Sequence, residues 1–327
     1  MDNNGKSYER LRAVSLFRQL PEDVLLKLGG LASEEHYERN DILFNEGEAG
    51  DALFLVVEGT VLIQKVLSKE EGTYKDLGVA EAGEIFGEMA LFDNMPRSAT
   101  VRATSTLTVL RIGRKEFDRF LQEDPESARV ILGGIINILS SRLRETAQHT
   151  ATLYEVGNSI ASISDMGELS RRVNERLEGA IFHVRGTAFC LWNPYMDECD
   201  VLYEDDLVPG TSHLLAVSKT GPMAGFLKYN RTPFIMKGLD EDHPLRTVFG
   251  LGDRDSLLVG PLMQREDVLG YIILAGRGEP FTSFHRILLS AVCTQVATAV
   301  VNFTYAQDAA ARDRLNEARG LSGLRRI

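Results

Sequence analysis

Short apolar segments separated by glycines fill the region between Glu38 and Ile112. Phe54–Val57 and Val61–Ile63 flank Glu58-Gly59-Thr60, a pattern typical of a β-hairpin. Many short strands at regular spacing predict a β-roll or barrel of the jelly-roll type. The glycines that punctuate this region are Gly47, Gly50, Gly59, Gly72, Gly78 and Gly83.

Helical patterns lie on both sides of this strand region. Residues from Tyr8 to about Leu31 carry apolar side chains at helical spacing, and Pro21-Glu22-Asp23 is typical of a helix start. After the strands, Arg114–Glu123 has a helical pattern, which Asp124-Pro125 interrupts before another helix begins near Glu126. The N-terminal part is therefore predicted to be a β-roll with helices at both ends.

The segments Phe86–Leu91 and Pro96–Thr100 combine a glycine turn with one acidic and one basic residue. Gly87 allows the backbone to approach an anion closely, and the residues after it are able to open a short helical turn whose amides face negative charge. Arg97 can form a bidentate bond to phosphate oxygens. Glu88 would be repelled by a phosphate, so it is expected to accept a hydrogen bond from a sugar hydroxyl, unless it simply pairs with Arg97 in the loop.

At these residues the chain resembles the cyclic nucleotide-binding domain family, from roughly Leu16 to Thr152. The resemblance implies that Glu88 binds the ribose 2′-hydroxyl and that Arg97 pairs with the cyclic phosphate. It also places several neighbouring residues around the phosphate: Gly87, Met89, Ala90, Ser98 and Ala99.

A long apolar stripe follows the strand region and runs further than an ordinary globular helix. It predicts a connecting helix over residues 126–165, either as the seam of a parallel homodimer or packed on its own domain. In the catabolite activator branch of the family, Thr146 would stand where the helix reaches the adenine amino group; its alternative is a surface threonine. The Thr146 match favours cAMP as the ligand. Ser98 is also able to reach a guanine amino group, so cGMP is the alternative ligand. The stripe consists of Leu132, Ile135, Leu139, Leu143, Leu153, Val156, Ile160 and Ile163.

The C-terminal half predicts an α+β domain, with helical pattern at its two ends and strands between. A short helix is expected within Gly221–Phe226. The half resembles the GAF sensory domain family over roughly Leu153–Gln307, but the Asn-Lys and Asp-Glu pairs of nucleotide-binding GAF domains are absent from Gly276–His285. The expected strands are Thr187–Trp192, Val201–Tyr203, Thr232–Met236, Ser256–Met263 and Val268–Ala275.

Composition narrows the functional classes. The chain has 327 residues and a formal net charge of −11, which argues against a broad nucleic-acid footprint. Its three cysteines, at positions 190, 199 and 293, lack metal-ligand spacing and read as reduced thiols. The N-terminus does not resemble a signal peptide, no membrane-spanning run is evident, and no catalytic motif is found. These features predict a cytoplasmic protein that is not an enzyme and binds no metal.

The sequence thus predicts an α+β protein with a cyclic-nucleotide-binding domain at 1–125, a connecting helix at 126–165, a GAF domain at 153–307 and a charged tail at 308–327. Its expected function is that of a cAMP receptor, a homodimer that passes ligand binding through the long helix to the GAF domain and an effector protein. The alternatives are a cAMP-responsive transcription regulator, or the sensory part of a kinase or cyclase whose output domain lies beyond Ile327.

Overall fold

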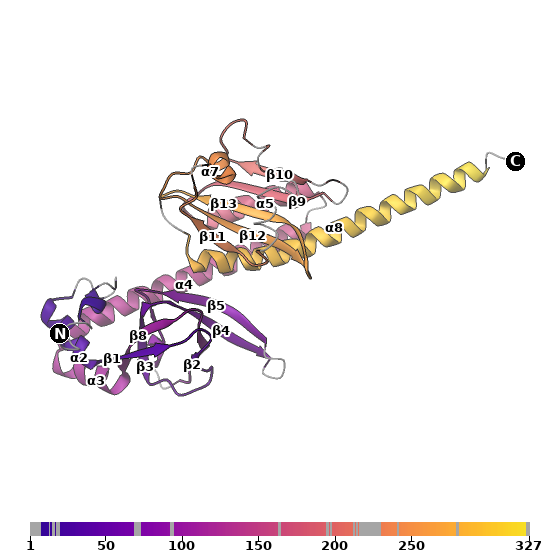
Figure 1. Ribbon diagram of the computed structural model, residues 1–327. Helices are drawn as coiled ribbons and strands as arrows, with labels where there is room; N and C mark the ends of the chain where they lie inside the picture. Colours follow the sequence, from indigo (N-terminus) through magenta and orange to yellow (C-terminus); the bar gives the residue numbers. More distant parts are fainter. Residues whose placement is uncertain are drawn as a thin grey trace. The chain divides into compact units, whose positions relative to one another are not determined.

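The protein is described by a computed structural model, which divides into two compact units, Met1–Glu145 and Thr146–Ile327 (Figure 1). Each unit is described by itself. The structure describes residues 8–12, 14, 17, 20–68, 73–91, 95–162, 165–193, 196, 198–211, 213, 215, 230–240, 242–278 and 281–324.

The first unit contains two four-stranded sheets, ordered β1-β8-β3-β6 and β2-β7-β4-β5, whose strand pairs are all antiparallel. This arrangement confirms the predicted β-roll. The strands are β1 (Ala32–Tyr37), β2 (Ile42–Phe44), β3 (Ala52–Glu58), β4 (Thr60–Ser68), β5 (Thr73–Glu81), β6 (Ile85–Phe86), β7 (Thr100–Ala103) and β8 (Leu107–Gly113).

Strand β3 supplies side chains to two separate cores because successive residues of a strand point to opposite faces. Leu53 and Leu55 pack with the helices α2 (Glu22–Leu31) and α3 (Arg114–Glu123). Phe54 instead packs between the two sheets. Helix α2 begins directly after Pro21, at the predicted helix start. Helix α3 spans its predicted range and ends at Glu123, with Asp124 as its C-cap directly before Pro125.

The predicted hairpin around Gly59 is wrong. Strands β3 and β4 belong to different sheets: β3 pairs with β8 and β6, whereas β4 pairs with β5 and β7. Gly59 forms the corner between the sheets with φ of 91°, and a Cβ there would lie 2.3 Å from the carbonyl oxygen of Thr106. A glycine at this site therefore turns the chain from one sheet to the other instead of folding it back on its neighbour.

A single helix, α4 (Pro125–Ser162), follows α3 and contains 38 residues. Asp124 begins it, since its Oδ1 accepts a hydrogen bond from the backbone N–H of Ser127 at 3.2 Å. The boundary between the units, after Glu145, falls within this helix. The helix therefore supplies residues to both units, Ile131 to a core of the first and Val156 to a core of the second.

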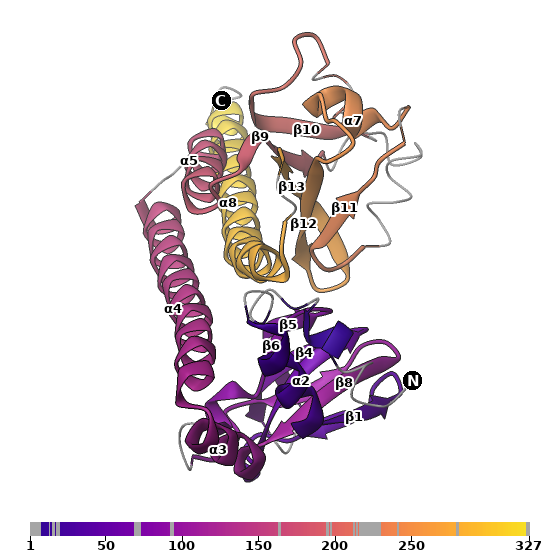
Figure 2. The same cartoon turned by 90° about the vertical axis from the view of Figure 1, so that its left-hand side faces the viewer.

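The second unit is built on a five-stranded antiparallel sheet in the order β10-β9-β13-β12-β11. Helices α5 (Met166–Ala180) and α8 (Ser283–Leu324) pack on one face, and α7 (Pro244–Phe249) packs on the other (Figure 2). The helix expected within Gly221–Phe226 lies outside the described residues. The five expected strands correspond to β9 (Val184–Trp192), β10 (Cys199–Asp205), β11 (Phe234–Lys237), β12 (Ser256–Gln264) and β13 (Asp267–Gly276).

Helix α8 bears on the expectation that no membrane-spanning run exists. Its first 24 residues, Ser283–Ala306, are long and apolar enough to cross a membrane by length and composition alone. Several of them, including Leu289, Val292 and Val296, are fully buried in the core on the sheet. Packing within the unit thus accounts for the buried part of this apolar run, which is 44% of it. Helix α8 also continues to Leu324, so the predicted tail is helical in its described part.

Candidate functional site

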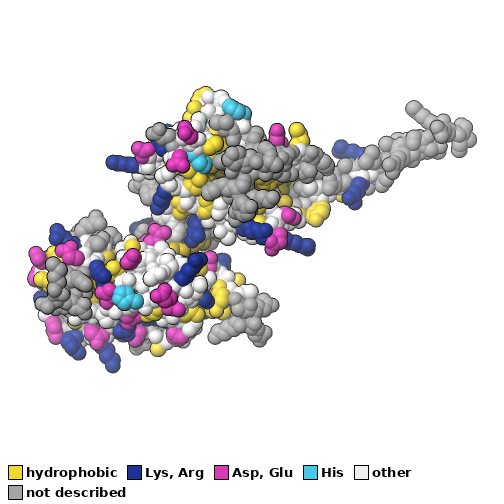
Figure 3. Space-filling view, viewed as in Figure 1, with side chains coloured by type: hydrophobic (Ala, Val, Ile, Leu, Met, Phe, Trp, Pro, Cys, Tyr) yellow, Lys and Arg dark blue, Asp and Glu magenta, His cyan; other side chains and the backbone are white. Residues whose placement is uncertain are grey.

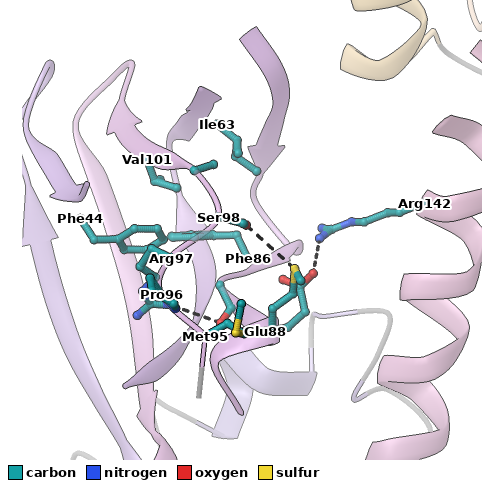
Figure 4. A pocket seen from close by; sticks show the side chains of 13 residues that line it. Phe44, Ile63, Phe86, Glu88, Met95, Pro96, Arg97, Ser98, Val101 and Arg142 are labelled. Atoms are coloured by element: carbon teal, nitrogen blue, oxygen red, sulfur yellow. Dashed lines mark hydrogen bonds and ion pairs between the residues drawn. The ribbon is translucent and has the colours of Figure 1, made fainter. Parts of the chain in front are cut away.

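A pocket of about 510 Å³ opens in the first unit beside the turn that follows β6 (Figure 4). Among the described residues, most of its lining is apolar, with one carboxylate, Glu88, and two guanidinium groups, Arg97 and Arg142. Such a combination suits a small organic anion that has an apolar part. The remaining lining residues are Phe44, Ile63, Phe86, Gly87, Met89, Met95, Pro96, Ser98, Ala99 and Val101.

The turn at Gly87 leads into a short 3₁₀ helix, η1 (Glu88–Leu91), which confirms the predicted helical turn. Gly87 has φ of 70°, a conformation that favours glycine. A Cβ at this position would lie 2.7 Å from Nη1 of Arg97. Close approach of a ligand was the predicted reason for a glycine here, and the structure adds a second one, which is that the arginine itself occupies the space a side chain would need.

Arg97 is buried, with 5% of its side chain exposed. Its Nη1 donates to the carbonyl oxygens of Ala52 at 2.9 Å and Gly87 at 3.2 Å, and its Nη2 lies 3.5 Å from Oδ1 of Asp51. Burial lowers the pKa of Arg97, while Asp51 acts in the opposite direction. The Nε atom is buried and has no hydrogen-bond partner among the described residues, so one donor of this cation is unsatisfied.

Glu88 pairs with a residue that was not predicted from the sequence. Its Oε1 lies 3.0 Å from Nη1 of Arg142 on α4, and Nη2 of Arg142 donates to the carbonyl oxygen of Ile85 at 2.7 Å. The alternative ion pair between Glu88 and Arg97 is not among the ion pairs of the described residues. Only the placement of Arg142 one helical turn before Thr146 could have drawn attention to it.

The other predicted residues divide between the two units. Met89, Ser98 and Ala99 line the pocket, where Ser98 Oγ donates to Sδ of Met89 at 3.9 Å. Ala90 lies on η1, but its side chain is not described. Thr146 belongs to the second unit, and its role at a nucleotide base stays a prediction.

Comparison with known proteins identifies the fold around the pocket. Residues 34–124 match the family described as "Cyclic nucleotide-binding domain", and they include the turn, Glu88 and Arg97. The first unit contains a cyclic nucleotide-binding domain. This finding confirms the corresponding resemblance in the sequence, whereas the GAF resemblance remains a prediction.

Known proteins with similar sequences match part of the chain. Human cGMP-dependent protein kinase 2 is 29% identical over 154 residues, which span 46% of this chain and 20% of the kinase. The cAMP-dependent protein kinase regulatory subunit of Mycosarcoma maydis is 30% identical over 155 residues, or 45% of this chain and 27% of the subunit. This chain thus matches only about a fifth to a quarter of these relatives' length.

One solved structure, the N-terminal domain of a transcriptional regulator from Streptomyces coelicolor A3(2), is 34% identical. It covers 40% of this chain and 92% of its own, with a TM-score of 0.36. Within the described residues, no group of three or more His, Cys, Asp or Glu side chains is arranged to hold a metal ion.

Proposed function

We propose that this chain is a cytoplasmic cyclic-nucleotide receptor, not itself an enzyme, which binds cAMP in preference to cGMP. The observation that carries the proposal is the buried Arg97, whose Nε lacks a partner among the described residues at the wall of a largely apolar pocket. A buried cation with an unsatisfied donor is costly without an anion. The single negative charge of a cyclic phosphodiester would offset that cost.

The two charged ends of the pocket would divide the ligand between them. Arg97 would bind the exocyclic phosphate oxygens through a charge-assisted bond. Glu88 is 6% exposed and keeps acceptor capacity beyond its bond to Arg142, so it would accept a hydrogen bond from the ribose 2′-hydroxyl. The apolar lining would take the purine, with Thr146 as the proposed contact to an adenine amino group and Ser98 as the contact that would admit guanine.

The distribution of charge supports a small ligand in preference to nucleic acid. On the face seen in Figure 3, the Lys and Arg side chains of the described residues are interspersed with Asp and Glu. The formal net charge is −11. A nucleic-acid surface would instead concentrate positive charge.

Helix α4 is the proposed route by which binding is communicated. It carries Arg142, which contacts the turn at the pocket (residues 85–88, the pocket turn) through Glu88 and the carbonyl oxygen of Ile85. The same helix continues to Val156 in a core of the second unit. A ligand that changes the Glu88–Arg142 pair would bias α4 by its difference in affinity between the two states. We assign the second unit as a GAF domain that receives this bias, with a coupling free energy of about 1–3 kcal/mol.

Titration calorimetry with cAMP, cGMP and 5′-AMP tests the binding proposal. We expect saturable binding of cAMP, weaker binding of cGMP, and the weakest binding of 5′-AMP, whose dianionic phosphate is not tied back to the ribose. Absence of binding of both cyclic nucleotides at millimolar concentration would refute the receptor assignment. Tight, salt-sensitive binding to a specific DNA site would support the transcription regulator instead.

Hydrogen exchange tests the proposed communication. We expect cAMP to change the exchange rates of α4 amides between residues 148 and 162, which lie beyond the pocket turn. The variant Arg142→Ala should bind cAMP but lose most of that change. An unaltered exchange pattern in α4 of the saturated wild-type protein would contradict the proposed route.

A further inference from the structure

The guanidinium group of Arg97 lies against an aromatic ring. Its Cζ is 4.0 Å from the ring centroid of Phe44, which ends β2, and 5.6 Å from that of Phe54 on β3. Figure 4 shows the Phe44 ring beside Arg97 at the wall of the pocket. A cation at this distance from an aromatic face is attracted by the ring quadrupole, and the attraction strengthens as water is removed.

Phe44 belongs to a cluster of three rings drawn from three strands. Phe54 and Phe86 stack at 5.2 Å with an interplanar angle of 8°, and Phe44 lies 5.7 Å from Phe54 and 6.1 Å from Phe86. All three rings are buried. The packing of β2 against β3 and β6 therefore fixes the ring that faces Arg97.

The hydrogen bonds of Arg97 do not use all of its donors, and the Phe44 ring is a further source of stabilisation for the cation. Nη1 is used by the carbonyl oxygens of Ala52 and Gly87, Nη2 lies at a longer distance from Asp51, and Nε has no partner among the described residues. A buried guanidinium that lacks one hydrogen bond needs another source of stabilisation to stay where it is. The face of Phe44 supplies it without occupying a donor.

We propose that Phe44 is a positioning residue, which holds the charged Arg97 at the wall of the pocket, through its ring quadrupole, before the ligand arrives. This inference rests on the proposed function, because the anion that Arg97 would meet is the phosphate of a cyclic nucleotide. A preformed cation avoids the cost of ordering a long side chain on binding. An aliphatic residue at position 44 would fill the same space but would leave Arg97 without this attraction.

A double-mutant cycle separates this role from packing. The variants are Phe44→Leu, Arg97→Gln and their combination, with Phe86→Leu as a matched loss of a ring that lines the same pocket but makes no comparable contact with Arg97 among the described residues. Affinities for cAMP, and for adenosine as a competitor that lacks the phosphate, are measured on the full chain by displacement of a fluorescent cyclic nucleotide.

We expect Phe44→Leu to weaken cAMP binding by about 3- to 30-fold, the range of a cation–π contact. The same change should cost less than about twofold in the Arg97→Gln background and for adenosine. Phe86→Leu should weaken cAMP binding by the same factor in the wild-type protein and in the Arg97→Gln variant. Equal losses for Phe44→Leu with and without Arg97, or for cAMP and adenosine, would show that Phe44 acts only by shape and would overturn the inference.

A second substitution guards against loss of the fold. Trifluorophenylalanine at position 44 keeps the shape of the ring and removes most of its quadrupole, so it should weaken cAMP binding while leaving adenosine binding and thermal stability nearly unchanged. Unchanged cAMP affinity in this variant would overturn the inference. If the wild-type protein binds no cyclic nucleotide, the proposed function fails; if it binds and the cycle shows no coupling, only the role of Phe44 fails.

Discussion

The carboxylate of Glu88 and the guanidinium of Arg142 form an ion pair at 3.0 Å, although 54 residues separate them in the chain. The same guanidinium donates to the carbonyl oxygen of Ile85 at 2.7 Å, so Arg142 contacts both the first residue of β6 and the first residue of η1. Glu88 is nearly fully buried, with 7% of its side chain exposed, whereas Arg142 is 32% exposed. The pair therefore fixes the pocket turn to the helix that leaves the first unit.

Removing Arg142 should destabilise the first unit. Arg142→Ala leaves the buried Glu88 carboxylate without its cation, so the free energy of unfolding should fall by about 1–3 kcal/mol. The double variant Glu88→Gln/Arg142→Ala should lose less than the sum of the two single changes, because it leaves no unpaired charge. Urea unfolding followed by circular dichroism measures these differences.

Arg144→Ala is the matched control for that change. Arg144 lies on the same helix and is exposed, and it takes part in none of the ion pairs described for the first unit. Its removal should alter the free energy of unfolding by less than about 0.5 kcal/mol. A similar loss in both variants would mean that the pair with Glu88 contributes nothing specific.

Arg97→Ala should weaken cAMP binding by about 2–5 kcal/mol, because it leaves the phosphate charge unpaired in a largely apolar pocket. Arg102→Ala on β7 removes the same charge from a residue that does not line the pocket, and it should leave the affinity nearly unchanged. Titration calorimetry compares the two variants. Near-normal affinity in Arg97→Ala would refute the role assigned to this residue.

Gly87→Ala should cost more stability than the same change at another left-handed glycine. Gly83 has φ of 91°, and a methyl group added there would meet no atom within 4 Å, so Gly83→Ala should carry only the backbone cost of about 1–2 kcal/mol. At Gly87 the methyl group would also meet Nη1 of Arg97 at 2.7 Å. We expect an additional loss of stability and weaker cAMP binding at Gly87 alone; equal behaviour of the two variants would argue against a tight contact between Gly87 and Arg97.

Local signals in the sequence predicted most of the elements around the pocket. The break at Asp124-Pro125 located the boundary between α3 and α4, because proline cannot continue a helix from the preceding turn. The glycine turn and its acidic and basic neighbours predicted η1 and the pocket residues Glu88 and Arg97. These features depend on neighbours in sequence, which a pattern can reveal.

Features that depend on distant contacts were not predictable in the same way. Gly59 resembled a hairpin glycine, yet the pairing partners of β3 and β4 lie elsewhere in the chain, so the turn became a corner between sheets. Arg142 and Phe44 carry no local motif, and only folding brings them to Glu88 and Arg97. Residues that complete a site from another element are therefore the ones that a single sequence conceals.

The second unit should lose stability on acidification. Burial, followed by the neighbouring His183 and His149, lowers the pKa of His285 from 6.5 to about 4. Between these pH values the unfolded chain binds more protons than the folded one. The contribution of His285 to the free energy of unfolding is therefore fully present above about pH 6.5 and is lost as the pH falls toward 4. Allowing for the partial exposure of the ring, we expect a loss of about 1–2 kcal/mol. Thermal unfolding across this pH range measures it.

His285→Gln isolates the contribution of this histidine. The Nδ1 atom of His285 accepts a hydrogen bond from the backbone N–H of Thr282 at 3.1 Å at the start of α8. Glutamine keeps an acceptor at this third helical position, as in a capping box, but does not titrate. The variant should remain folded at neutral pH and show a shallower loss of stability between pH 6.5 and 4; an identical pH profile would assign the effect to other groups.

The exposed apolar face of α4 leads to a last prediction, that two copies of the chain associate along this helix. Ile136 and Leu143 are 60% and 71% exposed, and they lie one heptad apart, the spacing of a coiled-coil seam. Val130 is an exposed apolar residue of the same helix outside that register. In a symmetric dimer, Ile136 and Leu143 of both chains would be buried. Leu143→Glu would then place two charges in the contact, one from each chain, and the loss of association free energy would be counted twice.

Leu143→Glu should therefore raise the dissociation constant of the dimer by at least about 100-fold, since each buried leucine is worth about 1.5–3 kcal/mol. Val130→Glu introduces the same charge and should leave the dimer intact. Light scattering and sedimentation equilibrium of the full chain distinguish the two variants. A monomeric wild-type protein at micromolar concentration would show that this face does not pair two chains, whereas dissociation by both variants would place the contact outside the heptad register.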